Sequence, residues 1–206
     1  MIKVLTHYTA NWANLMDVTL PILERYCEKN GYQLSVFKNT PYDTYTGKEK
    51  IRQVLSVCED GDIALVLDAD TIITNPEIRV EGFINDNQDF YITNHVGKVN
   101  SGVFIVRLST WSRAFLNFLL SVIGMGWVHC EQDAIVKYLN EYPNDKKICI
   151  LPHPSINSLM YQLYPEHKDI TTEEEGNWTP NHLLLHLPGV GMDKRLEILT
   201  KIKETL

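Results

Sequence analysis

The sequence lacks three features, and each absence excludes a class of protein. No stretch approaches the ~18 consecutive apolar residues of a membrane-spanning helix, and residues 1–7 become polar too early for a secretory signal. No two cysteines form a C-x-x-C pair, so we expect buried free thiols rather than a zinc or redox centre. Positive charge is scarce, because 19 Lys and Arg face 26 Asp and Glu for a net charge of −7. We therefore expect a cytoplasmic protein that neither spans a membrane nor binds nucleic acid.

The chain does contain the composition of a globular domain. Its 206 residues are 44% hydrophobic and 22% charged, which is typical of soluble globular proteins. This length supports a substantial hydrophobic core and fits one ordinary domain. We therefore expect a single domain that spans residues 1–206.

The first 70 residues alternate between strand patterns and helix patterns. Apolar residues such as Leu15, Val18 and Ile22 recur with a helical period, and short apolar runs indicate strands. This βαβαβ order predicts a mostly parallel sheet covered by helices. The expected strands are residues 2–6, 32–37 and 63–67, and the expected helices are residues 12–29 and 48–58.

The rest of the chain continues this alternation less regularly. Apolar runs predict five more strands, and helical periods predict three more helices, the last one capped by Asp193. Polar residues and prolines dominate residues 39–46 and 152–181, which we interpret as loops. The expected strands are residues 71–74, 90–93, 103–106, 148–151 (buried) and 182–186, and the expected helices are residues 110–122, 131–140 and the C-terminal segment.

Two carboxylates follow a strand that is expected to be buried on both faces. The apolar run 63–67 leads directly into Asp68-Ala69-Asp70, and open α/β sheets bind ligands at the carboxyl ends of their strands. One interpretation is a polar turn in which each Asp accepts local backbone hydrogen bonds. The other is a divalent cation that neutralises both acids and carries a phosphate-bearing ligand. We favour the metal site because the pair follows a buried strand within the βαβαβ frame.

A histidine occupies a similar position later in the chain. His186 follows three leucines and precedes Leu187-Pro188-Gly189, so it also ends an apolar strand beside a turn. Taken alone, it fits a hydrogen-bonded histidine at a strand end. Together with Asp68 and Asp70 it offers the nitrogen and oxygen ligands that suit Mn²⁺ or Mg²⁺, with diphosphate oxygens completing the shell.

Four ordered motifs resemble those of GT-A fold glycosyltransferases. The nearest resemblance is to the galactosyl/mannosyl/xylosyltransferase family of the yeast mannan and plant xyloglucan enzymes, with a looser one to the glycogenin-like group. It covers about residues 1–190 and implies an α/β, Rossmann-like GT-A domain with a mostly parallel central sheet flanked by helices. The motifs are Leu65-Val66-Leu67-Asp68-Ala69-Asp70, Asn100-Ser101-Gly102-Val103-Phe104-Ile105-Val106-Arg107 with Trp111-Ser112, Glu131-Gln132-Asp133-Ala134, and His186-Leu187-Pro188-Gly189.

The resemblance implies how the chain holds a nucleotide sugar. Asp68, Asp70 and His186 would bind Mn²⁺ or Mg²⁺ against the diphosphate of a UDP- or GDP-sugar. Tyr8, after the first strand, would stack on the base or else be a tyrosine at the edge of the core. The other residues expected to contact substrate are Thr6, Asp68, Ala69, Asn100, Ser101 and Gly189.

Basic residues near the diphosphate are expected on two helices. The family places a lysine or arginine on the helix before the D-x-D strand, which points to Lys48, with Lys50 and Arg52 as alternatives. The competing structural interpretation is that these residues form a solvated face of the helix. Relatives also carry a basic residue soon after the late histidine and glycine. Here residues 190–193 intervene, so Lys194, or Arg195, would take that place.

The expected catalytic residues are Gln132 and Asp133, because their motif lies near the anomeric carbon of the donor in related enzymes. The structural interpretation is that they are first-turn helix residues whose charge complements the dipole. Likewise Asn100 and Ser101 either bind sugar or phosphate or form a turn before a strand. The resemblance implies retention of anomeric configuration, whereas inversion would require Asp133 as a base.

We therefore expect a metal-dependent hexosyl- or pentosyltransferase that acts on a glycan, glycolipid or protein acceptor. The metal would stabilise the departing nucleoside diphosphate as a Lewis acid. A haloacid dehalogenase-like phosphatase is one alternative, since its paired-aspartate motif resembles Asp68-Ala69-Asp70, although it usually has threonine where this chain has Ile72. A non-catalytic module that binds nucleotide sugars is the other.

Overall fold

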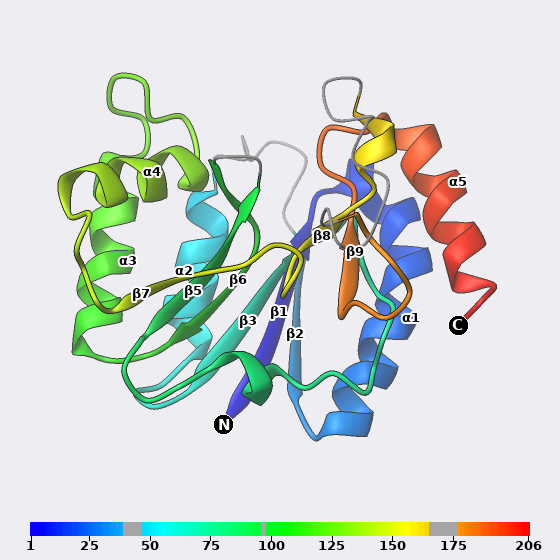
Figure 1. The fold of residues 1–206 in the computed structure, drawn as a ribbon, viewed down its shortest axis with the longest axis horizontal. Coiled ribbons are helices and arrows are strands. Elements are labelled where there is room, and N and C mark those ends of the chain that lie inside the picture. Colours follow the sequence, from blue (N-terminus) through cyan, green and yellow to red (C-terminus); the bar gives the residue numbers. More distant parts are fainter. Residues whose placement is uncertain (39–46, 96–97, 165–176) are drawn as a thin grey trace.

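The computed structural model describes residues 1–38, 47–95, 98–164 and 177–206. Within them a six-stranded sheet with the order β2-β1-β3-β6-β5-β7 forms the centre of the molecule (Figure 1). Only β6 runs against its neighbours in this sheet, so the expected mostly parallel sheet is confirmed. The strands are β1 (Ile2–Tyr8), β2 (Gln33–Lys38), β3 (Ile63–Asp68), β5 (Phe90–His95), β6 (Lys98–Arg107) and β7 (Ile148–Leu151).

Helices cover both faces of this sheet, as Figure 1 shows. Successive strand side chains point to opposite faces, so Leu65 and Leu67 pack in one hydrophobic cluster and Ala64 and Val66 in another. The first cluster lies under α1 and α5, and the second lies under the other three helices. The helices are α1 (Ala13–Asn30), α2 (Lys48–Val57), α3 (Thr110–Val122), α4 (Glu131–Glu141) and α5 (Met192–Lys203).

Local signals explain where several helices begin and end. Gly31, with φ of 71°, ends α1 in the left-handed conformation that glycine adopts at low cost. The side chain of Ser109 accepts a hydrogen bond from the N–H of Ser112 at the start of α3, a typical N-cap. The expected cap of α5 is wrong, because Gly191 precedes the helix. Asp193 lies instead in the first turn, where its charge complements the helix dipole.

A small second sheet has the order β4-β9-β8. Its middle strand β9 is antiparallel to β4 and parallel to β8. The prediction of a loop over residues 152–181 is therefore partly wrong, because β8 lies inside that range and is stabilised by pairing with a distant strand. Residues 165–176 of that segment, and the loop expected at 39–46, lie outside the described residues. The strands are β4 (Thr71–Ile73), β8 (Ser158–Leu159) and β9 (Leu184–His186).

Two strands of the central sheet also differ from expectation. β6 begins at Lys98 rather than Val103, so Asn100-Ser101-Gly102 lies within the strand and not in a turn before it. Its register with β5 shifts between Ile92 and Thr93, an irregularity that the sequence does not signal. β7 was expected to be buried, but it is an edge strand whose Ile150 is 49% exposed.

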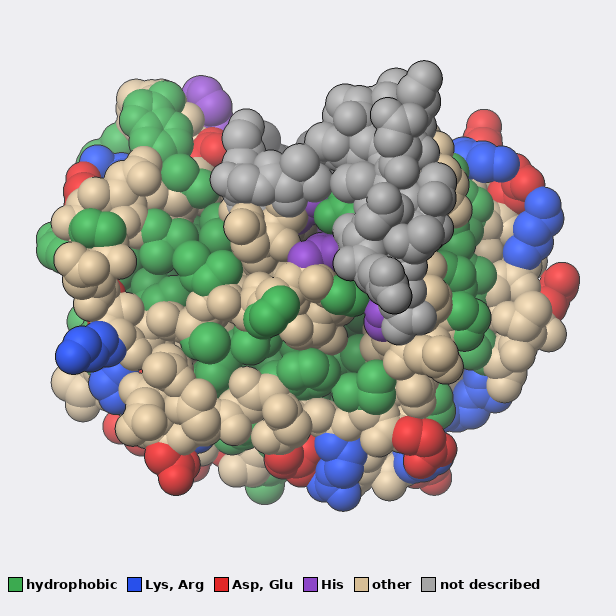
Figure 2. Space-filling view, in the orientation of Figure 1, with side chains coloured by type: hydrophobic (Ala, Val, Ile, Leu, Met, Phe, Trp, Pro, Cys, Tyr) green, Lys and Arg blue, Asp and Glu red, His purple; other side chains and the backbone are tan. Residues whose placement is uncertain are grey.

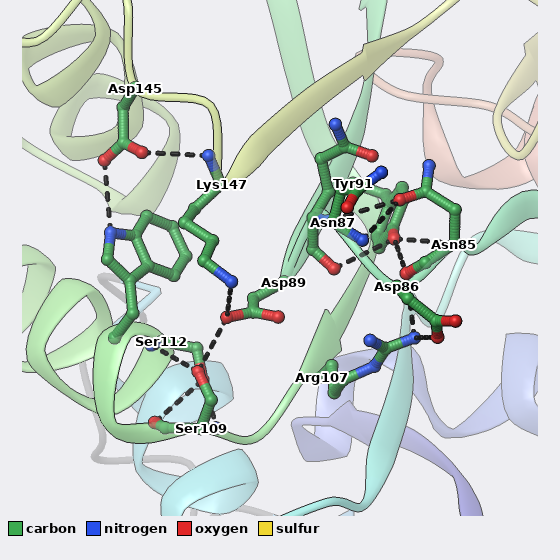
Figure 3. A network of polar contacts seen from close by, with 12 residues as sticks. Asn85, Asp86, Asn87, Asp89, Tyr91, Arg107, Ser109, Ser112, Asp145 and Lys147 are labelled. Atoms are coloured by element: carbon green, nitrogen blue, oxygen red, sulfur yellow. Dashed lines mark hydrogen bonds and ion pairs between the residues drawn. The ribbon is translucent and has the colours of Figure 1, made fainter.

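A polar network ties α3 to the edge of the sheet where β5 begins (Figure 3). Asp89 accepts a hydrogen bond from the Ser109 hydroxyl at 2.8 Å and lies 3.3 Å from Nζ of Lys147. Nearby, the Trp111 indole N–H donates to Asp145 at 3.1 Å. Asp89 is buried, and its partners offset the cost of removing its carboxylate from water.

Candidate active site

The acidic pair lies at the carboxyl end of β3, where the chain turns into β4. Asp68 is the last residue of β3, and the Thr71 hydroxyl donates to its carbonyl at 2.7 Å. The carbonyl of Asp70 accepts a hydrogen bond from the N–H of Leu187 at 3.2 Å. Because these backbone groups are paired within the fold, both carboxylates are held in place at the sheet edge.

Pairing of β4 with β9 brings the histidine to the acids. Thr71 lies opposite His186 in the antiparallel register, and Nε2 of His186 lies 3.4 Å from Oδ1 of Asp70. One ligand atom from each of Asp68, Asp70 and His186 lies within 4.8 Å of the others. The structure therefore brings together the three expected metal ligands, and two carboxylates with one imidazole could hold a divalent cation.

Arg195, in the first turn of α5, pairs with Asp70. Its Nε lies 3.2 Å from Oδ2 of Asp70 and donates to the Leu187 carbonyl at 2.8 Å. Burial opposes ionisation of Asp70, but His186 in its protonated form and Arg195 outweigh it and lower the pKa of that carboxyl. The sequence favoured Lys194 here, but Lys194 pairs with Glu197 at 3.0 Å. Adjacent helical residues point about 100° apart, so only one of the two can face the acid.

Lys50 in α2 is the cation beside Asp68, and its side chain is fully buried. Its Nζ lies 2.6 Å from Oδ1 of Asp68 and 2.8 Å from Oε1 of Glu131. It also donates to the Ser101 carbonyl at 3.0 Å. Of the three candidates, Lys50 is the one that reaches the acidic pair. Residues two apart on a helix point to nearly opposite sides, and contact of Lys48 with the donor stays a prediction.

Glu131, the first residue of α4, completes this buried network. Its Oε1 also accepts from the Ser101 hydroxyl at 3.1 Å. Burial raises the pKa of Glu131, but Lys50 and this hydrogen bond outweigh it, so the pKa is lowered. Burial raises the pKa of Asp68 despite Lys50. The sequence missed Glu131 as a site residue because nothing in the pattern shows that Lys50 is buried and requires a carboxylate partner.

A cavity of about 290 Å³ opens beside the acidic pair. Tyr8, Ala69 and Gly189 line it, as the sequence expectation requires. Thr6 lies outside it, because its side chain is buried within the core of β1. The other lining residues are His7, Thr9, Trp12, Asp68, Asp70, His186, Pro188 and Arg195.

Trp12 and His7 line this cavity but are not among the site residues expected from the sequence. The ring of Trp12 lies under Arg195, with the guanidinium carbon 4.7 Å from the ring centroid, a favourable cation–π contact. Burial and the nearby Lys50 lower the pKa of His7 to about 4. His7 is therefore neutral at physiological pH, and Arg195 supplies positive charge on this side of the cavity.

A second cavity of about 680 Å³ shares Pro188 and Gly189 with the first. It is lined also by Asn100, Lys194, Tyr164 and His95. The ring centroids of Tyr164 and His95 are 6.5 Å apart, and the rings meet edge to face. Figure 2 shows histidine side chains in the middle of this face, beside the grey segments. Besides Gly189, the sequence-predicted residues Asn100 and Lys194 thus lie on this cavity.

The first turn of α4 contains the two expected catalytic residues, and they face differently. Oε1 of Gln132 accepts from the N–H of Ser101 at 3.2 Å, so Gln132 lies against β6 near Lys50. Oδ2 of Asp133 accepts from the N–H of His129 at 2.8 Å. The carboxylate of Asp133 therefore holds the loop before its own helix, and its catalytic role stays a prediction.

Comparisons of the sequence with known proteins give two matches. The family described as "Protein of unknown function, DUF273" matches residues 23–122. "Probable alpha-1,6-mannosyltransferase MNN10" of Saccharomyces cerevisiae is 25% identical over 190 residues, covering 71% of this chain and 48% of that protein. The chain thus spans about half the length of this relative.

The fold is shared with solved glycosyltransferases. One is "a glycosyltransferase involved in the glycosylation of the major capsid of PBCV-1", with 18% identity, a TM-score of 0.72 and coverage of 97% of this chain and 98% of that chain. The galactosyltransferase LgtC, solved with donor and acceptor sugar analogs, has 13% identity, a TM-score of 0.62 and coverage of 99% and 96%. GlyE of Streptococcus pneumoniae TIGR4 has 14% identity, a TM-score of 0.61 and coverage of 98% and 61%.

Several sequence expectations can now be compared with these findings. No helix in the described parts of the chain is long and apolar enough to cross a membrane, while a cytoplasmic location stays a prediction. The haloacid dehalogenase-like alternative gains no support from these structural likenesses. With a mostly parallel sheet flanked by helices and this agreement along its length, the chain has the GT-A glycosyltransferase fold, as its motifs implied.

Proposed function

We propose that this protein is a metal-dependent glycosyltransferase that moves a sugar from a nucleotide-sugar donor to an acceptor hydroxyl with retention of configuration. The observation that carries the proposal is the convergence of Asp68, Asp70 and His186 beside a cavity in a GT-A fold. The names of the similar proteins, a mannosyltransferase and a galactosyltransferase, support the reaction class.

The site is suited to a diphosphate. Asp68, Asp70 and His186 would hold Mn²⁺ or Mg²⁺, and the ion would supply Lewis-acid stabilisation of the leaving group. Arg195 lines the same cavity, and its fork of five N–H donors can bind phosphate oxygens besides Asp70. Lys50 forms an ion pair with Asp68 and offsets part of the negative charge of the acidic pair.

The cavity accommodates the nucleoside rather than the whole donor. Its volume of about 290 Å³ is at the lower end of small-molecule sites, and Tyr8 offers an aromatic wall for the base. The sugar would then extend past the acids toward Ser101 and Gln132, which meet at the start of α4.

Retention is favoured because the carboxylates of α4 are already engaged. An inverting enzyme requires a carboxylate base opposite the leaving group, but Glu131 is bound to Lys50 and Ser101, and Asp133 to the backbone of His129. In the retaining reaction, the bond from the anomeric carbon to the diphosphate breaks while the acceptor oxygen bonds on the same face. The hydroxyl proton passes to a diphosphate oxygen.

The second cavity would receive the acceptor. It adjoins the donor cavity at Pro188 and Gly189, so a hydroxyl group there can approach the donor sugar. Aromatic rings such as Tyr164 pack against the apolar faces of sugars, and Asn100 offers hydrogen bonds to hydroxyls. A glycan, glycolipid or glycosylated protein presents such a group.

The test combines binding with product analysis. UDP- and GDP-sugars should raise the Tm of the wild type only with Mn²⁺ or Mg²⁺, and should not raise that of Asp70→Asn, because ligands stabilise the state they bind. NMR of the product should show the same anomeric configuration as the donor. Absence of metal-dependent stabilisation contradicts the proposal, an inverted product contradicts retention, and binding without transfer to any acceptor supports a non-catalytic module.

A further inference from the structure

A chain of hydrogen bonds connects His186 to the backbone of β6. Nδ1 of His186 lies 3.0 Å from Oδ1 of Asn157, and Nδ2 of Asn157 donates to Oδ1 of Asn100 at 2.9 Å. That oxygen of Asn100 also accepts from the N–H of Gly102 at 2.9 Å. Asn157 is 1% exposed and directly precedes β8, which pairs with β9 beside His186.

The backbone N–H of Gly102, at one end of this series of hydrogen bonds, fixes the direction of every bond in the series. The N–H of Gly102 can only donate, so the Asn100 atom that it contacts is the carbonyl oxygen. Asn157 must then present its NH₂ group to that oxygen, which turns its own carbonyl oxygen toward His186. An oxygen there only accepts, so Nδ1 of His186 carries a hydrogen.

The position of the imidazole ring is fixed as well. A Cβ atom added to Gly102 would lie 2.1 Å from Cε1 of His186 and 2.7 Å from Nε2, so the ring packs directly on the β6 backbone. Its other nitrogen, Nε2, faces Oδ1 of Asp70 at 3.4 Å. With Nδ1 committed to Asn157, Nε2 is the atom that remains for a cation shared with the acids.

We propose that Asn157 is a positioning residue that holds His186 as the Nδ1–H tautomer, so that Nε2 presents its lone pair to the site formed with Asp68 and Asp70. Partners of this kind commonly orient histidines that bind metals. The inference rests on the proposed metal site for its purpose, whereas the tautomer itself does not require a metal. No sequence pattern pointed to Asn157, which lies in the segment interpreted as a loop.

The first experiment uses the metal-free protein. A ¹⁵N–¹H NMR correlation of the histidine side chains should show His186 protonated at Nδ1 in the wild type and in Asn157→Asp, which keeps an acceptor. In Asn157→Leu the proton should move to Nε2, where it can donate to Asp70. Asn177→Leu is the matched control, because Asn177 accepts from the N–H of Tyr161 at 3.0 Å in the same region and does not bind His186. Unchanged Nδ1 protonation in Asn157→Leu would overturn the proposal.

The second experiment measures Mn²⁺ affinity by calorimetry. Loss of an outer partner typically weakens metal binding about 10- to 100-fold, so we expect this for Asn157→Leu, with most of the affinity restored in Asn157→Asp. Equal losses in Asn157→Leu and Asn177→Leu would show a merely structural role and overturn the proposal. If the wild type binds no Mn²⁺, the proposed function fails, while the NMR result still decides the tautomer. Should Asn157→Leu not fold, Asn100→Ala removes the oxygen that sets the direction of the Asn157 amide and should give both tautomers.

Discussion

The central sheet carries ion-paired acids at both ends of its strands, and the two groups are built differently. At the edge where strands β3 and β5 begin, Asp62 lies 2.7 Å from Lys3. On the same edge, Asp89 accepts from Ser109 at 2.8 Å and lies 3.3 Å from Lys147 (Figure 3). Each of these acids joins two or more elements of the fold, as structural ion pairs do.

At the opposite edge, Asp68 and Asp70 are paired with cations just as closely, yet they also converge. Their ligand atoms lie within 4.8 Å of each other and of His186, beside a cavity. Two carboxylates held this close repel each other, and Lys50 and Arg195 offset part of that repulsion. Burial and ion pairing therefore do not distinguish a functional site from a structural ion pair, whereas convergence of the side chains beside a cavity does.

The largest expected effect comes from removing one charge at the converging edge. Asp70→Asn should lower the rate of sugar transfer by about a thousandfold or more, because metal stabilisation of a leaving group contributes several kcal/mol. Enzyme assays and thermal melts would check this. Asp89→Asn, at the other edge, should lower the Tm but keep the rate within about twofold. A similar loss of rate in both variants would remove the distinction between the edges.

Removing the buried lysine should give the next largest effect. Lys50→Met leaves Asp68 and Glu131 without their shared cation, and a buried charge stripped of its partner costs about 3–5 kcal/mol. Urea unfolding would measure the loss, and adding Glu131→Gln should recover part of it. Lys48→Met, on another side of α2, should change the free energy of unfolding by at most about 0.5 kcal/mol. Equal losses would show that the Lys50 network does not hold the site.

A methyl group at Gly102 tests the packing of His186. Gly102→Ala places a Cβ within 2.1 Å of the imidazole, so the ring must move and Mn²⁺ affinity should fall at least about tenfold. Gly82→Ala is the control, because a Cβ there meets nothing within 4 Å. Calorimetry that gives equal affinities for Gly102→Ala and the wild type would contradict the proposed ligand role of His186.

Where β5 begins, around Asp89, a smaller change in stability is expected without loss of function. Ser109→Ala removes both the cap of α3 and a hydrogen bond to Asp89, which should lower the free energy of unfolding by about 1–2 kcal/mol. Denaturant titration measures this value. Transfer activity at a temperature where the variant is fully folded should remain close to that of the wild type.

The smallest expected effect is a pH dependence at the same edge. Burial opposes ionisation of Asp62, but the hydrogen bond from Lys3 and further donors outweigh it and lower the pKa to about 2. Since the unfolded value is about 3.9, this stabilisation is present above pH ~4 and is lost as the pH falls toward 2. After allowance for solvent screening it amounts to about 1 kcal/mol. The stability gap between the wild type and Asp62→Asn should therefore close below pH ~4 in urea titrations.

The sequence predicted well those elements whose pattern is local. The helix expected at residues 110–122 is observed as Thr110–Val122, and the expected strand 148–151 as Ile148–Leu151. It failed where pairing with a distant segment decides, as in β8, which depends on β9. The start of β6 was missed because Asn100-Ser101-Gly102 has the composition of a turn, and pairing of residues 98–100 with residues 93–95 of β5 extends the strand.

By itself, the sequence determined that Asp68 and Asp70 follow one apolar strand and that His186 ends another, whereas their meeting depends on the pairing of β4 with β9 in the second sheet. Only the tertiary structure decided which neighbours serve them. Lys50 rather than Lys48, and Arg195 rather than Lys194, follow from the rotation of α2 and α5 against the sheet. A local pattern fixes which face of a helix is apolar, but the group that a polar side chain reaches depends on packing between elements far apart in the chain.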